Sequence, residues 1–225
     1  MRRLVERQSH DTDPFAIGQM AILKAAISAP RLAGEDFMPR TRSVVEAMTT
    51  KRLVLRQPHA TEGSAVLHLL SSLPSAAIED AIPSIVPHRH WALVVRALRK
   101  ATPKIVLLVI ARKRYPSPLI GLAMLAAATE GQAKLGLALA PRYQGRGYGL
   151  EALHALVHYG WKSGEYSTLI GECTVSNRPA QALMRRAGMT LRYRLKMEMP
   201  DGSPRVILGF VVERQLPIHP SQETS

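Results

Sequence analysis

A glycine-rich stretch at residues 141–149, Pro-Arg-Tyr-Gln-Gly-Arg-Gly-Tyr-Gly, is the part of this chain most suited to bind a charged ligand. The apolar run at residues 135–140 predicts a strand before it, and residues 150–158 predict a helix after it. A turn of this kind directs backbone N–H groups and the positive end of the helix dipole toward one point. Gly145, Gly147 and Gly149 allow left-handed backbone and the close approach of a ligand. The stretch therefore predicts a phosphate-binding loop.

The spacing of these glycines differs from two common phosphate motifs. The dinucleotide fingerprint needs its third glycine one residue later, and the P-loop needs a lysine after the glycines. The pattern Gln144-x-x-Gly147-x-Gly149, after a strand and a proline, resembles the pyrophosphate loop of the GNAT superfamily of acetyl-CoA-dependent N-acetyltransferases. A glycine-rich turn that binds nothing is the alternative.

A second motif supports the same resemblance. Residues 171–177 end in Asn177, a helix follows, and Gly188 lies eleven residues further on, as in the GNAT segment where an asparagine joins a strand to a helix. Asn177 is a good helix N-cap and Gly188 a good C-cap. The resemblance further implies that the strand before the loop splays from its parallel neighbour, which leaves backbone groups free for the pantetheine arm and the thioester carbonyl. It implies an acetyl-CoA site made by Leu137, Ala138, Leu139, Gln144, Gly145, Arg146, Gly147, Tyr148, Gly149 and Asn177.

Glu172 is the candidate catalytic residue. It lies five residues before Asn177 in an otherwise apolar strand. A carboxylate is uncommon at such a position unless it is paired or has a function. In the ribosomal-protein alanine N-acetyltransferases, a glutamate at this spacing acts as the general base. The resemblance implies that role for Glu172, and an outward-facing, solvated strand residue is the alternative.

The sequence departs from the family at the general acid. The family usually has a tyrosine seven residues after the asparagine, whereas this chain has Met184, which cannot donate a proton. Tyr193 and Tyr148 are candidates without support from their positions. The stretches 52–56 and 147–153 look more like the branch of the ribosomal-protein serine acetyltransferases, which commonly lacks that tyrosine.

Other residue types exclude some chemistry. His154 and His158 have the i, i+4 spacing of metal ligands, but no third ligand is evident, so we expect a helix surface and no metal. Cys173 is the single cysteine, which excludes an internal disulfide and is typical of a cytoplasmic protein. No apolar run is long enough to span a bilayer, and no convincing signal peptide is present.

The formal net charge is +13, and residues 1–49 hold seven Lys or Arg against six Asp or Glu. The excess of positive charge therefore lies in the rest of the chain, where it favours an anionic cofactor, an acidic substrate or ribosomal RNA. No RNA-binding motif is recognisable, and nucleic acid is left open. We expect acetyl-CoA and an amine acceptor as partners, no membrane, and a monomer or homodimer.

The elements that must position these residues alternate between strand and helix patterns. We expect a GNAT domain over residues 48–214, an extension over 1–47 that is poorly ordered or holds a short helix at 14–27, and a polar tail over 215–225. Met48 resembles a natural start. The expected strands are residues 51–56, 104–113, 119–127, 133–140, 168–175, 191–199 and 206–212, and the expected helices are residues 61–73, 90–100, 150–161 and 178–187.

This order is that of the GNAT acyl-CoA N-acyltransferase fold, an α/β fold with a mixed, mostly antiparallel sheet flanked by helices. The resemblance implies transfer of acetyl from acetyl-CoA to a primary amine by direct attack, the amine belonging to a protein N-terminus or a small molecule. The alternative is a catalytically weak GNAT-fold module that binds acetyl-CoA or associates with the ribosome or RNA.

Overall fold

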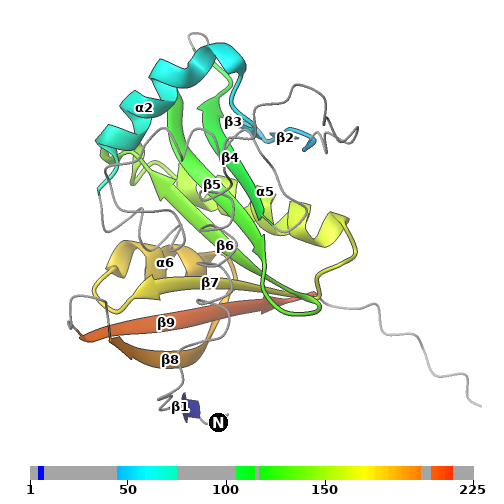
Figure 1. Cartoon of the computed structure of the whole chain (residues 1–225), viewed down its shortest axis with the longest axis vertical. Coiled ribbons are helices and arrows are strands. Elements are labelled where there is room, and N and C mark those ends of the chain that lie inside the picture. Colours follow the sequence, from blue (N-terminus) through cyan, green and yellow to red (C-terminus); the bar gives the residue numbers. More distant parts are fainter. Residues whose placement is uncertain (1–4, 8–44, 75–104, 115–116, 199–203, 215–225) are drawn as a thin grey trace, which may run out of the picture.

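A nine-stranded sheet organises the residues that the computed structural model describes, which are 5–7, 45–74, 105–114, 117–198 and 204–214 (Figure 1). The strand order is β1-β8-β9-β7-β6-β5-β4-β3-β2, in which β1 with β8 and β6 with β7 are parallel and every other pair is antiparallel. The strands are β1 (Val5–Arg7), β2 (Met48–Thr49), β3 (Leu53–Arg56), β4 (Ile105–Arg112), β5 (Leu119–Ala127), β6 (Gln132–Leu139), β7 (Thr168–Thr174), β8 (Thr190–Glu198) and β9 (Pro204–Glu213). The expected mixed, mostly antiparallel sheet is confirmed.

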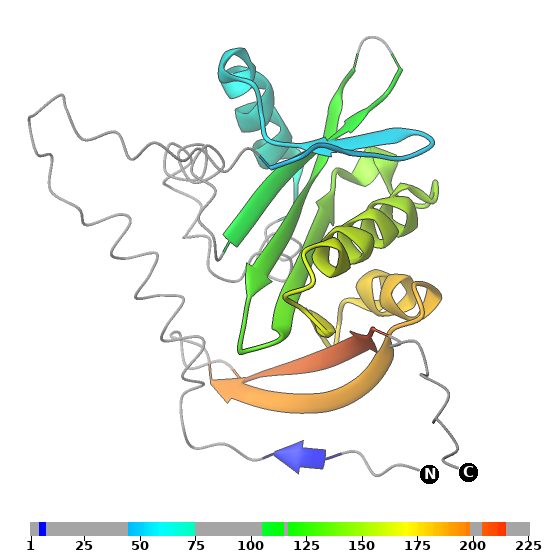
Figure 2. The same cartoon turned by 90° about the vertical axis from the view of Figure 1, so that its right-hand side faces the viewer.

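Helices cover both faces of this sheet. The α-helices are α2 (Gly63–Ser72), α5 (Tyr148–Lys162) and α6 (Arg178–Arg186), and the short 3-10 turns are η1 (Ala60–Glu62) and η2 (Pro141–Tyr143). Figure 2 shows α5 and α6 on one side of the strands. Consecutive residues of β4 alternate between two buried clusters: Leu108 packs in the cluster of α5 and α6, and Leu107 in that of α2. The sheet therefore separates two cores.

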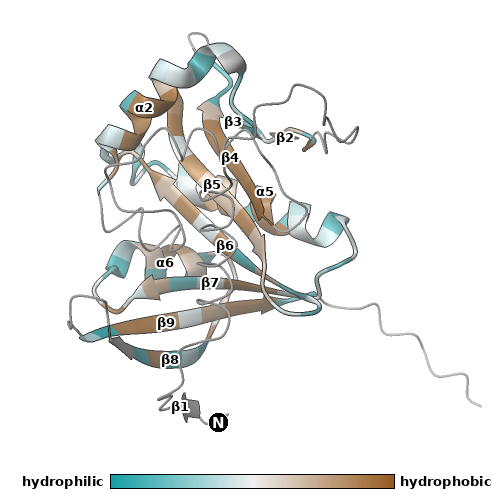
Figure 3. Cartoon of the chain, viewed as in Figure 1, coloured by the Kyte–Doolittle hydropathy of each residue, from teal (hydrophilic) through white to brown (hydrophobic). Residues whose placement is uncertain are grey.

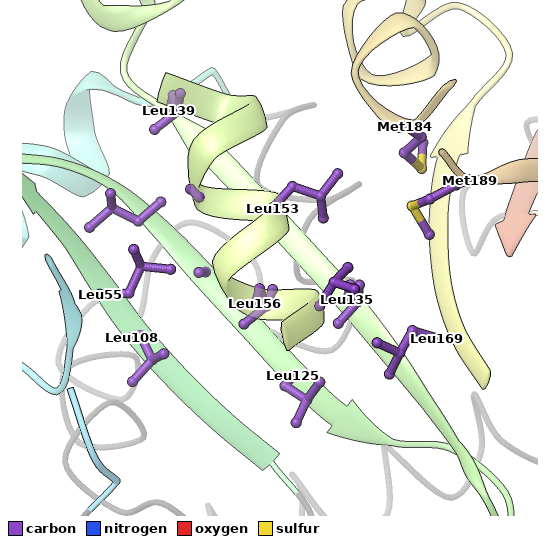
Figure 4. Packing of buried hydrophobic residues seen from close by; sticks show 14 of the residues in the cluster. Leu55, Leu108, Leu125, Leu135, Leu139, Leu153, Leu156, Leu169, Met184 and Met189 are labelled. Carbon is purple, nitrogen blue, oxygen red and sulfur yellow. The ribbon is translucent and has the colours of Figure 1, made fainter. Parts of the chain in front are cut away.

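The core beneath α5 is built mainly from leucines. Leu153 and Leu156 of α5 lie over Leu125 and Leu135 of the sheet, and Met184 and Met189 extend the same layer toward β7 (Figure 4). Eight of the nine residues of β5 are buried, so this strand is apolar on both faces, and it is correspondingly hydrophobic along much of its length in Figure 3. An uninterrupted apolar run is what a central strand covered on both sides requires.

The predicted elements within the described residues are confirmed, with bounds that differ by at most two residues. The main correction concerns the start of the first strand. Lys51 and Arg52 belong to the turn of a β2–β3 hairpin, in which Met48 pairs with Leu55, and β2 itself was not anticipated. The Thr50 hydroxyl accepts a hydrogen bond from Leu53 N at 2.9 Å, which closes this turn and excludes both residues from the strand.

The predicted helices at residues 14–27 and 90–100 and the polar tail at 215–225 lie outside the described residues. Within the described part of the chain, no helix is long and apolar enough to cross a membrane. The proposed domain boundaries at residues 47 and 214 stay predictions.

We predict that a chain beginning at Met48 keeps the fold. The described residues before Met48 contribute the pairing of β1 with β8, the packing of Val45 on the core, and an ion pair between Glu46 and Lys162 at 2.6 Å. The ion pair joins exposed side chains, and such pairs contribute about 0–1 kcal/mol. In thermal unfolding the shortened chain should melt within about 4 °C of the full chain, the shift expected for about 1 kcal/mol. A larger loss would make the first 47 residues part of the domain.

Candidate functional site

The glycine loop joins β6 to α5 and has the backbone expected of an anion-binding turn. Gly145 and Gly147 have φ angles of +70° and +76°, which favour glycine, and Gly147 is the N-cap of α5. The prediction of a left-handed backbone is wrong for Gly149, which lies in the first turn of α5. A Cβ there would come within 3.4 Å of the Leu183 side chain, so this glycine permits close packing of α5 on α6.

Hydrogen bonds within the loop decide which groups remain for a ligand. The Gln144 side chain donates to Leu139 O at 2.9 Å, and its backbone N–H donates to Pro141 O at 3.1 Å. Both donors therefore shape the loop. The Glu151 N–H donates to Gly147 O, and the three residues before it begin α5 without an acceptor one turn earlier in that helix. Their N–H groups lie at the end of the helix that favours an anion.

A half-buried carboxylate anchors the loop to the first hairpin. Glu151 accepts hydrogen bonds from the Thr50 hydroxyl at 2.6 Å, from Arg52 N at 2.7 Å and from Arg52 Nε at 2.6 Å. The Arg52 guanidinium lies 4.5 Å from the centre of the Tyr148 ring and donates to Arg146 O at 3.1 Å. Burial alone would raise the pKa of Glu151, but these hydrogen bonds and the positive charge outweigh it and lower the pKa below its ordinary value of 4.5.

The two parallel strands separate next to this loop. Pairing of β6 with β7 runs only from Gln132 opposite Thr168 to Leu135 opposite Gly171. Since Ala140 N donates to Ile120 O, on the β5 side, and backbone groups alternate along a strand, the N–H groups of Leu137 and Leu139 point to the β7 side. The expected splay is confirmed. A cavity of about 60 Å³ lies at the opening, lined by Leu137, Gly171 and Glu172 among others.

Asn177 and Gly188 cap α6 beside this cavity. Asn177 Oδ1 accepts a hydrogen bond from Ala180 N at 3.1 Å, and Asn177 also lines the cavity. At the other end, Gly188 has a φ of +81°, and Met189 N donates to Met184 O, as in a Schellman motif. Both predicted caps are confirmed. Met184 is buried, and its sulfur lies 2.5 Å from where a Cβ on Gly171 would stand, so the methionine packs closely against this glycine of β7.

Glu172 borders the cavity from the other face of the sheet, because its neighbours on β7, including Cys173, pack beneath α5 and α6. The Tyr193 hydroxyl donates to Glu172 Oε1 at 2.6 Å, and Lys134 Nζ lies 2.9 Å from Glu172 Oε2. The sequence indicated Tyr193 only as a candidate acid without support from its position, and Lys134 was not predicted. The signal for Lys134 was available: it is a charged residue inside an apolar strand, as Glu172 is.

The histidine and cysteine candidates have no role in this site. His154 and His158 are exposed on α5, and no group of three or more metal-ligating side chains occurs in the part of the chain that the structure describes. Cys173 is buried, as expected of a small apolar residue in a strand. Tyr148 is also buried, beneath the Arg52 guanidinium.

Comparison with known proteins identifies the class to which this fold and site belong. Residues 52–190 match the model of the acetyltransferase (GNAT) domain, which covers more than half of the chain. The chain belongs to the GNAT family of acetyltransferases.

Individual relatives are distant. An N-acetyltransferase of Bacillus subtilis (strain 168), YnaD, itself uncharacterized, is 31% identical over 70 residues, which cover 31% of this chain and 41% of that protein. Among solved structures, an acetyltransferase of Salmonella typhimurium that modifies the N-terminal serine of ribosomal protein L7/L12 matches 76% of this chain and 100% of its own, with a TM-score of 0.63 and 17% identity. The microcin C7 self-immunity acetyltransferase MccE, solved with acetyl-CoA and AMP, matches 73% and 94%, with a TM-score of 0.59 and 20% identity. These likenesses show the fold.

We predict that Glu151→Gln lowers the stability of the protein at neutral pH and has less effect in acid. Because the pKa of Glu151 is lowered in the folded state, its carboxylate stabilises the fold above its ordinary value of 4.5, and this contribution is lost as the pH falls through the folded value. Urea unfolding of both proteins at about pH 7 and about pH 4 measures this. Glu213→Gln is the control, since Glu213 is exposed and lies 3.4 Å from Arg192. If Glu151→Gln lowers the free energy of unfolding as much at about pH 4 as at about pH 7, the carboxylate of Glu151 does not stabilise the fold through its charge.

Proposed function

We propose that this protein transfers the acetyl group of acetyl-CoA to a primary amine by direct attack of the amine on the thioester. The observation that carries the proposal is the opening between β6 and β7, with the glycine loop next to it and Glu172 bordering its cavity. A phosphate-bearing cofactor could therefore bind at the same opening that the carboxylate of Glu172, a possible proton acceptor, borders.

The cofactor would lie on the helical side of the opening. The amides of the glycine loop and of the first turn of α5 would bind the pyrophosphate, aided by the helix dipole. Backbone groups of Leu137, Ala138 and Leu139, of which the N–H groups of Leu137 and Leu139 face the opening, would bind the pantetheine arm and polarise the thioester carbonyl. Asn177 borders the same cavity and would contact the arm near its sulfur. Acetyl-CoA supplies the acetyl group as a thioester: a C–N bond forms, the C–S bond breaks, and the CoA thiolate leaves and takes up a proton from water.

Glu172 would act as the general base. An amine is a nucleophile only after it loses a proton, and α-amino groups have a pKa of about 8, so most are protonated at neutral pH. A carboxylate beside the cavity can take that proton directly or through a water. The side chain is 17% exposed, which leaves it within reach of an acceptor while excluding most solvent.

A protein N-terminus is the first acceptor to test, because the structurally similar Salmonella typhimurium enzyme modifies an N-terminal serine. A peptide with a free N-terminal serine, the same peptide with a blocked N-terminus, and a small polyamine separate the acceptor classes when release of CoA is followed. Turnover with the blocked peptide alone would show that an amine elsewhere in the peptide is used.

Met184 favours a second candidate, a GNAT module that binds acetyl-CoA without efficient turnover. The side chain in the place of the family's acid is buried against Gly171 and cannot donate a proton. Calorimetric binding of acetyl-CoA with no acetylation of any amine in a broad panel would support this candidate over the first.

We predict that Gly147→Asp weakens acetyl-CoA binding. The substitution places a carboxylate at the N-cap of α5, where the pyrophosphate should lie, and repulsion of about 1.4 kcal/mol or more would lower the affinity at least about 10-fold. Calorimetry with acetyl-CoA measures the change. Gly164→Asp is a matched control, because Gly164 has nearly the same φ, +75°, and lies in open space beyond the other end of α5. Equal acetyl-CoA affinity in the two folded variants would show that the pyrophosphate does not bind to this loop.

We predict that Glu172→Gln lowers the rate of acetyl transfer by about 10²-fold or more at neutral pH, with little change in acetyl-CoA affinity. The amide keeps the shape of the side chain but cannot take up a proton. At about pH 10, above the α-amino pKa of about 8, the acceptor arrives neutral and the defect should shrink. Steady-state rates across this pH range test the role. A variant with near-normal turnover at neutral pH would make Glu172 a structural strand residue.

A further inference from the structure

Three neighbouring strands place Glu172, Gly209 and Tyr193 in one row across the sheet. Gly209 of β9 pairs with Glu172 of β7 on one side and with Tyr193 of β8 on the other. Residues paired directly across strands project from the same face. A Cβ on Gly209 would overlap the ring of Tyr193, so the ring lies over the glycine. Only a glycine between them lets the tyrosine hydroxyl reach the carboxylate across the intervening strand.

The carboxylate of Glu172 is thereby held from two directions. Tyr193 donates to Oε1 at 2.6 Å, and Lys134, on β6, lies 2.9 Å from Oε2. The donors come from strands on opposite sides of β7, and Lys134 and Glu172 are each 17% exposed. A glutamate side chain without such partners would rotate about three bonds, and restricting that freedom costs free energy that fixed donors offset.

We propose that Tyr193 is a positioning residue for the reaction: lying over Gly209, it orients the carboxylate of Glu172 together with Lys134 so that an unused lone pair faces the β6–β7 opening. This inference rests on the proposed role of Glu172 as the base. It assigns Tyr193 to the base rather than to the missing acid, because an ionised carboxylate only accepts hydrogen bonds and the phenol must be the donor.

A purely structural role for Tyr193 makes a different prediction. An aromatic ring that covers a glycine in a neighbouring strand stabilises a sheet by packing alone. Phenylalanine would keep that packing and remove only the hydroxyl. The variant Tyr193→Phe therefore separates packing from positioning.

We expect Tyr193→Phe to lower kcat for the acceptor amine about 10- to 100-fold, the effect of losing one hydrogen bond to a charged group. The variant should remain folded at the assay temperature, and the KM for acetyl-CoA should stay unchanged. Tyr166→Phe is the control, because it likewise removes one hydroxyl from a tyrosine, here a buried ring outside the β6–β7 opening, and should leave kcat unchanged. Gly209→Ala displaces the Tyr193 ring while keeping its hydroxyl, and should lower kcat in the same way.

The double variant Tyr193→Phe/Glu172→Gln decides whether the tyrosine acts through the glutamate. If it does, the double variant should be no slower than Glu172→Gln alone, because the residue that Tyr193 orients is already inactive. If the rate defects of the two single variants multiply in the double variant, the proposal is overturned and Tyr193 has a role separate from Glu172. Full activity of Tyr193→Phe beside an impaired Glu172→Gln would overturn only the positioning role. Full activity of Glu172→Gln would overturn the proposed base, and with it this inference.

Discussion

The short parallel contact between β6 and β7 is the constraint on which the arrangement of the site depends. Each strand has an antiparallel partner along nearly its whole length, β5 for β6 and β9 for β7, whereas their mutual pairing spans four positions. Beyond Leu135 and Gly171 each strand follows its own partner, and the sheet opens. Backbone groups that would pair in a continuous sheet then face a cavity, where buried polar groups need a partner. A ligand in the gap can provide it.

The opening also joins two surfaces that the sheet otherwise separates. On one side lie α5, α6 and the glycine loop, and on the other lies the carboxylate of Glu172 with Lys134 and Tyr193. In our proposal a cofactor with anionic phosphates and an amine that must lose a proton therefore approach through different faces. Their charges are kept apart until the reacting atoms meet in the gap.

The sequence was sufficient for the features that depend on neighbours along the chain. The strand, glycines and helix of the loop, the Asn177 N-cap and the Gly188 C-cap lie within a few residues of the groups they bind. The sequence was insufficient for interactions between residues that are far apart along the chain. Glu151 binds residues 99 and 101 positions away, and the meeting of Tyr193 with Glu172 depends on the register of two hairpin strands. That register shifts between Leu191 and Tyr193, and alternation of residue types along β8 does not reveal such a shift.

The anchoring of Glu151 has a consequence for how the molecule responds to a ligand. Because one carboxylate ties the β2–β3 hairpin to the first turn of α5, and the Arg52 guanidinium continues to the carbonyl of Arg146, the hairpin and the loop share a common set of hydrogen bonds. Free-energy coupling between two sites is reciprocal. An anion that orders the loop must therefore also slow the opening of the hairpin at the edge of the sheet. Slower amide hydrogen exchange at Leu53 would then report that an anion occupies the glycine loop, although β3 itself provides no group that binds the anion.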